Sequence, residues 1–249
     1  MKLLAITGLT LRELRHSKLV VLPLTVAIAL VLVAANIQNP ELYGDKLLQG
    51  SWTGLAFMGA LVGILAASSL VSSEIERGTM LLLAARPVPR SSIVLGKALG
   101  IAVYLALCAL LWAVTLAAGL GRETEAGAAV AFAGALVALA PMLLGAVLAL
   151  TASTVFPTRG AIGATLAVWL AAAIVAAIPL GAVKPENRDR VDVAQDLLGW
   201  VIPTGRLGEL REGVLGMSVS GSAWGALLVP ALWLGAATVL LARRSSLAR

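Results

Sequence analysis

Six long runs without a charged residue constrain this chain more than any other feature of its sequence. The runs cover residues 19–40, 47–73, 98–121, 126–158, 160–183 and 213–242. Each run is long enough to cross the hydrocarbon core of a bilayer, which is about 30 Å thick and needs about 20 apolar residues as a helix. A mean hydropathy of +0.95 with only 13% charged residues lies outside the range of soluble globular domains.

We therefore predict a single all-α integral membrane domain over residues 1–249. Ala and Leu dominate the runs and favour helix, and the alternating ten-residue segments of a membrane β-barrel are absent from the sequence. We interpret the first run as an uncleaved helix, because the residues before it include Glu13 and are too many for a signal peptide. The six predicted spans lie near 19–36, 52–72, 98–120, 128–152, 161–180 and 222–242.

The distribution of Lys and Arg predicts the orientation. With the N-terminus inside, the inner segments have a net charge of +9 and the outer segments −3, within a total of +6. This is the asymmetry of the positive-inside rule, and it predicts a multi-pass protein of the cytoplasmic membrane with both termini in the cytoplasm. The basic charge is spread over the ends of several inner segments. It therefore does not indicate a nucleic-acid partner.

Several chemistries do not fit the residues that are present. The single Cys108 and the single His16 cannot form a metal site or a thiol relay. Gly96-Lys97-Ala98 lacks the upstream Gly and the hydroxyl of a phosphate-binding loop, so we expect no ATP site and no catalysis on this chain. The predicted spans contain no Asp, Glu, Lys, Arg or His, so we expect any energy for transport to come from outside the bilayer.

A polar segment between the second and third spans stands apart from the rest. Ser73 and Glu76 have capping-box spacing, which predicts that a new helix begins there. Pro87-Val88-Pro89 predicts a stiff turn before the next span. The residues between Glu76 and Pro87 would form a short helix that is apolar on all sides. Such a helix must pack against its own bundle or against a partner. The alternative is an ordinary solvated loop that bears positive-inside charges.

The stretch ERGTMLLLAARPVPRSSIVLGK resembles the segment between the second and third helices of ABC-2 type transporter permeases. The matching residues are Glu76, Gly78, Thr79, Leu81, Leu82, Leu83, Pro87, Arg90, Leu95, Gly96 and Lys97. The resemblance implies a cytoplasmic coupling helix, and we call residues 73–92 the coupling segment. The residues that we expect to couple the chain to an ATPase are Glu74, Glu76, Arg77, Gly78, Thr79, Leu82, Pro87, Pro89, Arg90, Gly96 and Lys97.

The resemblance extends to both sides of the coupling segment. LLAITGLTLRELRHSK is similar to the amphipathic N-terminal elbow helix of the family, in which Leu4, Leu11 and Leu14 would enter the membrane interface. Residues 196–216 resemble the short outer helices between the fifth and sixth spans. The family further implies a separate ATP-binding subunit that holds ATP and Mg²⁺, a second permease copy or paralogue, and contact with lipid, while this chain itself holds no cofactor.

The residues alone leave the function of the chain open between three alternatives. The chain exports an unidentified substrate or, alternatively, is a mechanotransmitting anchor that passes force to an outer partner without translocation. A third alternative is a membrane scaffold that works without an ATPase.

Small residues recur at helical spacing in the second and fourth spans and predict close helix contact, either inside one subunit or between two. These small residues are Gly59, Gly63, Ala67, Gly134 and Gly145. Three prolines fall within predicted spans and can kink them: Pro141, Pro179 and Pro230.

Overall fold

Long helices packed side by side form the molecule. The computed structural model describes residues 2–35, 40–76, 90–119, 127–176 and 232–240, together with 188, 190, 191 and 193–195, and every regular element in this part of the chain is helical. The elements are α1 (Lys2–His16), a 3₁₀ turn η1 (Lys18–Val20), α2 (Val21–Ala35), α3 (Pro40–Glu76), α5 (Arg90–Gly119), α6 (Gly127–Ser153) and α7 (Thr158–Ala176), with helix again at 232–240.

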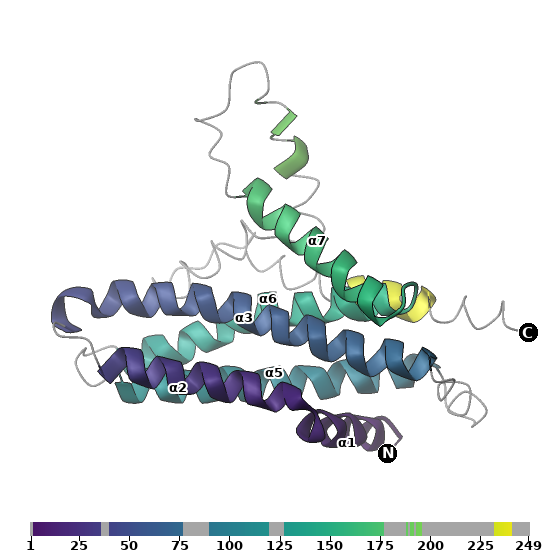
Figure 1. Cartoon of the computed structure of the whole chain (residues 1–249), viewed down its shortest axis with the longest axis horizontal. Coiled ribbons are helices and arrows are strands. Elements are labelled where there is room, and N and C mark those ends of the chain that lie inside the picture. Colours follow the sequence, from purple (N-terminus) through teal and green to yellow (C-terminus); the bar gives the residue numbers. More distant parts are fainter. Residues whose placement is uncertain are drawn as a thin grey trace, which may run out of the picture.

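The arrangement of these helices is shown in Figure 1. α3 packs against α6, α6 also packs against α5, and α2 lies along α5. α7 leaves the others at a steep angle (Figure 1). The prediction of an all-helical fold is confirmed for the described residues.

Three helices are long and apolar enough to cross a membrane. Their apolar windows are Gly54–Val71 in α3, Ser92–Gly119 in α5 and Ala131–Ser153 in α6. α1 and α2 add a fourth candidate when they are counted as one span bent by 63°. The described part of the chain thus supports a multi-pass membrane protein, and the complete six-span arrangement remains a prediction.

The second predicted span belongs to a much longer helix. α3 runs without a break for 37 residues, which at 1.5 Å per residue is roughly 55 Å. The helix start that we predicted from Ser73 and Glu76 is therefore wrong. A capping box requires a non-helical residue at its first position, whereas Ser73 lies inside α3. No Gly or Pro interrupts residues 64–76, so the existing helical ladder continues instead of restarting.

Small residues bring α3 and α6 into close contact. A Cβ at Gly63 would lie 2.9 Å from the Met142 carbonyl oxygen, and one at Gly145 would lie 3.2 Å from the Ala60 carbonyl oxygen. A Cβ at Gly59 would collide with the Met142 side chain. Of the two open interpretations of the small residues, the structure supports packing inside one subunit.

The remaining predicted features of the fold have mixed outcomes. Pro141 lies inside α6, which continues from Gly127 to Ser153. α6 ends in a tight turn in which the Phe156 N–H donates to the Ala152 carbonyl at 2.8 Å, and α7 begins at Thr158. Pro179, Pro230 and the predicted outer helices of residues 196–216 lie outside the described residues.

Candidate functional site

The elements that flank the coupling segment meet at one end of the bundle, which we call the charged end. α3 ends there at Glu76 and α5 begins at Arg90. α1 lies against the start of α5 at the same end (Figure 1). The helix at residues 232–240 joins them, because Val94 of α5 and Ala237 pack in one buried cluster.

The sequence-predicted site residues divide into two groups. Five of them lie in described helices: Glu74 and Glu76 in the last two turns of α3, and Arg90, Gly96 and Lys97 in the first turns of α5. The other six lie in residues 77–89, outside the described residues; they are Arg77, Gly78, Thr79, Leu82, Pro87 and Pro89. The structure therefore brings the two ends of the predicted site together and leaves its middle as a prediction.

Lys97 is the buried charge of this site. Its side chain is only 3% exposed. The Nζ ammonium donates a hydrogen bond to the Leu70 carbonyl oxygen of α3 at 3.0 Å. A buried ammonium is costly unless it is hydrogen-bonded, and this bond joins the two helices that flank the coupling segment. The position of Lys97 in the motif predicts a site residue, whereas its burial and its Leu70 partner have no local signal in the sequence.

Gly96 and Gly100 form a notch on α5 that receives α1; we call this pair the glycine notch. A Cβ at Gly96 would lie 2.7 Å from Cγ2 of Ile6, and one at Gly100 would lie 2.7 Å from the Thr10 Cβ. Only glycine permits this close approach of the two helices. The Thr7 hydroxyl also donates to the Gly96 carbonyl at 3.2 Å. The Gly-x-x-x-Gly spacing of residues 96–100 was the available sequence signal, and the sequence analysis missed it.

The contact with α5 determines which side of α1 is buried. Thr10 and Leu14 are each 1% exposed, and Leu11 packs against the core cluster that contains Leu14. Leu4 is 73% exposed. The prediction that Leu4, Leu11 and Leu14 share one interfacial face is therefore wrong. The apolar spacing was read correctly, but the glycine notch turns the side of α1 that bears Leu14 toward the protein.

A proline in α2 creates a second contact that crosses between helices. Pro23 has no N–H, so the carbonyl of Leu19, four residues earlier, cannot receive the usual helical hydrogen bond from residue 23. The hydroxyl of Tyr104 on α5 donates to this carbonyl at 3.1 Å. The indole Nε1 of Trp112 donates to the Pro23 carbonyl, also at 3.1 Å. Two α5 side chains thus position α2.

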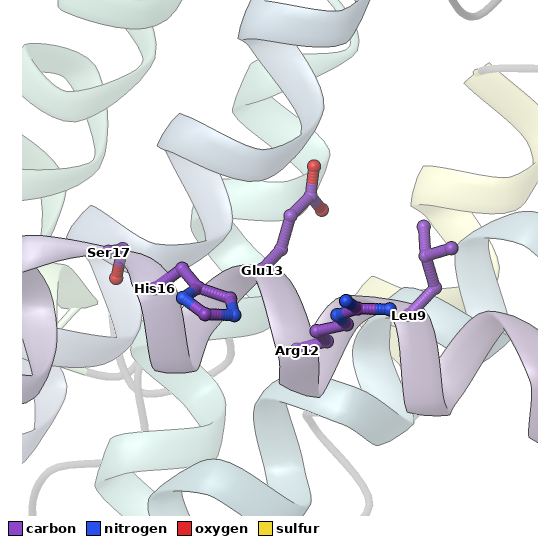
Figure 2. Close-up of a pocket in the computed structure, with 5 residues that line it drawn as sticks. All are labelled: Leu9, Arg12, Glu13, His16 and Ser17. Carbon is purple, nitrogen blue, oxygen red and sulfur yellow. The ribbon is translucent and has the colours of Figure 1, made fainter.

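The outward side of α1 forms an open surface depression, which is lined by four residues of α1 and by Ser17, the residue that follows it. Figure 2 shows these residues, which are Leu9, Arg12, Glu13, His16 and Ser17. Arg12, Glu13 and His16 are all solvent-exposed. Within the described residues no group of three His, Cys, Asp or Glu side chains is arranged to hold a metal ion. The depression has the character of an open helix surface and lacks the walls of a substrate cavity.

Comparison with known proteins agrees with this architecture. The described helices are those of a multi-pass helical membrane protein. The sequence profile of the ABC-2 family transporter proteins matches residues 16–244. The chain belongs to this family, whose members are transmembrane components of ABC transporters and generally work with an ATP-binding subunit. No curated protein matches the chain.

Proposed function

We propose that this chain is the permease subunit of an exporter that a separate ATP-binding subunit drives, with the coupling segment as the contact between the two. Family membership supports the role of a membrane permease subunit. One structural observation favours the coupling segment as the contact. The two helices that flank it, α3 and α5, are joined directly by the hydrogen bond from Lys97 to Leu70, so displacement of the segment reaches both helices.

The residues of the spans support an external energy source. The predicted spans contain no Asp, Glu, Lys, Arg or His. In the structure the apolar window of α5 includes Lys97, whose ammonium donates to the Leu70 carbonyl. An ion-coupled transporter places its mechanism on charged groups inside the membrane, and such groups are scarce in the predicted spans. In the proposed mechanism the partner holds ATP and Mg²⁺, and its closure moves the coupling segment. α3 and α5 then tilt within a dimer of permease chains and open a path to the outer side.

The predicted orientation completes the proposal, with the charged end in the cytoplasm. Cysteine-accessibility labelling in a Cys108→Ala background tests this orientation. Cysteine at Arg90 is expected to react only from the cytoplasmic side, and cysteine at Glu186 only from the outer side. Reaction of position 186 from the cytoplasmic side alone would overturn the orientation.

Affinity purification from membranes of the native host tests the central proposal. Mass spectrometry is expected to find an ATP-binding subunit in complex with the tagged chain, and the complex is expected to hydrolyse ATP in lipid vesicles. The isolated chain is expected to bind no nucleotide. Recovery of the chain without any ATP-binding subunit, under conditions that preserve other transporters of the same membrane, would contradict the proposal.

Substitutions in the coupling segment then locate the contact. Breaking a buried, hydrogen-bonded charge pair costs about 2–5 kcal/mol, so Glu76→Ala or Arg90→Ala should reduce recovery of the complex by more than tenfold. Gly78→Leu should act in the same way by holding the two surfaces apart. Glu186→Ala, the same type of change in a predicted outer segment, is the matched control and should leave recovery unchanged. Exposed charges contribute only about 0–1 kcal/mol, and normal recovery in all three variants would refute the assignment.

A further inference from the structure

Lys97 occupies a position where an apolar side chain would be expected. It lies one helical turn from Ile93 and one turn from Ile101 on the same face of α5. Ile93 is 3% exposed and Ile101 is 1% exposed, so this face points into the protein. Residues of the chain itself bury the Lys97 side chain. A charge inside an apolar row requires a specific reason.

The hydrogen bond to Leu70 supplies part of that reason. A carbonyl oxygen has two lone pairs, so Leu70 can accept from Lys97 and also keep its place in the helical ladder of α3. Burial of a charged group costs desolvation free energy even where a hydrogen bond offsets part of it, and an apolar side chain of similar size carries no such cost. Stability alone therefore does not explain a lysine here, and fixed geometry between the two helices is the better explanation.

The hydrogen bond between Lys97 and Leu70 lies close to the ends of α3 and α5 that border the coupling segment. Leu70 precedes the end of α3 by six residues, and Lys97 follows the start of α5 by seven. The contact therefore joins the flanking helices close to the point where the chain leaves one and enters the other. A displacement of α3 or α5 at this end would therefore be resisted by the other helix through this bond.

We propose that Lys97 is a positioning residue that makes α3 and α5 respond together when the ATP-binding subunit acts on the coupling segment. This inference rests on the proposed function. Removal of the ammonium should leave the bundle folded, while the two helices should no longer respond together.

Three variants isolate the role of the ammonium. Lys97→Met keeps the length of an unbranched side chain and removes the donor. Lys97→Arg keeps a charged donor and is expected to restore the behaviour of the wild type. Thr115→Val is the matched control, because it removes a hydrogen bond of α5 that stays inside this helix, from the Thr115 hydroxyl to the Leu111 carbonyl.

Hydrogen exchange followed by mass spectrometry measures the response in the full complex. The complex is placed in discs of phosphatidylethanolamine and phosphatidylglycerol, with and without ATP and vanadate. In the wild type, amide protection should change in both α3 and α5 on trapping. In Lys97→Met, amide protection should change in only one of the two helices on trapping. Without nucleotide, amides near Leu70 should exchange about tenfold faster in this variant, because a bond to a charged donor is lost.

Each outcome decides the proposal. A joint response of α3 and α5 in Lys97→Met, as in the wild type, would overturn it, and so would a separated response in Thr115→Val. If Lys97→Met does not fold, Lys97→Gln, which is uncharged and shorter, is expected to fold and show the separated response; loss of native protection in both variants would mean that Lys97 serves stability instead. A wild-type complex that does not respond to ATP would overturn the proposed function and this inference with it, and that failure appears before any substitution is made.

Discussion

Two regions of this bundle hold their helices together in different ways. At the interface of α3 and α6, glycine and alanine allow the backbones to approach, and a Cβ at Gly63 would meet the Met142 carbonyl oxygen at 2.9 Å. At the charged end, polar side chains make hydrogen bonds from one helix to a carbonyl of another, as Lys97 does to Leu70 and Thr7 to Gly96. Close backbone packing leaves little room for rearrangement, whereas a hydrogen bond fixes one distance and leaves other movements possible.

The largest effect is expected at the first region. Gly63→Leu would place a side chain against a backbone oxygen that cannot move without distortion of α6, and overpacking costs about 1–3 kcal/mol or more. We expect a loss of stability of about 3 kcal/mol or more. The thiol of Cys108, which is buried, provides the measurement, because a thiol-reactive dye reports its exposure during thermal unfolding.

The control for this substitution is Gly163→Ala in α7. No atom lies within 4 Å of a Cβ built at Gly163. Gly→Ala inside a helix is then expected to be neutral or to stabilise by about 0.5–1 kcal/mol. Equal melting temperatures for Gly63→Leu and wild type would show that the interface of α3 and α6 is not close-packed.

A smaller effect is expected at the glycine notch. Gly96→Leu would meet the side chain of Ile6, which can move more easily than a backbone oxygen. We expect α1 to leave α5 at a cost of about 1–3 kcal/mol, with the α3–α6 interface unchanged. Hydrogen exchange of residues 2–16 should increase strongly while that of α6 stays at the wild-type level. Equal increases in both helices would remove the distinction between the two regions.

The smallest effect is expected for Tyr104→Phe. This substitution removes one inter-helix hydrogen bond without changing the packing of the helices, so it separates the two ways in which the bundle is held together. The substitution leaves the Leu19 carbonyl without the donor that replaces the missing N–H of Pro23. Because this hydrogen bond is only partly buried, we expect its loss to cost about 0.5–1.5 kcal/mol. Pro23→Ala restores an N–H and should make Tyr104→Phe less costly. A double-mutant cycle on thermal stability measures this coupling. Full additivity of the two changes would contradict the assigned role of Tyr104.

The sequence predicted the helices far better than their contacts. The charge-free runs located α3, α5 and α6, because the length and apolar composition that a membrane span requires are properties of each run by itself. The family motif identified Gly96 and Lys97 for the same local reason. Their partners, Ile6 and Leu70, could not be predicted, because they depend on how helices distant in sequence approach one another.

The two errors have the same physical origin. The capping-box spacing of Ser73 and Glu76 is a local signal for a helix start, and it has no effect when the preceding residues are already helical. The spacing of Leu4, Leu11 and Leu14 is a local signal for an apolar face, and the glycine notch of another helix decided how that face is oriented. Both patterns describe what a segment can do by itself, and its neighbours select the outcome.

The unbroken length of α3 has a geometric consequence. The helix has 37 residues and no proline after its first residue, Pro40. A rod of roughly 55 Å that pivots by about 10° at its Glu76 end sweeps its opposite end through about 9 Å. Because α3 is close-packed against α6, such a pivot would move the two helices as one body. A small rotation at one end would then give a displacement about as wide as a helix at the other end, and the number of residues in α3 sets the size of that displacement.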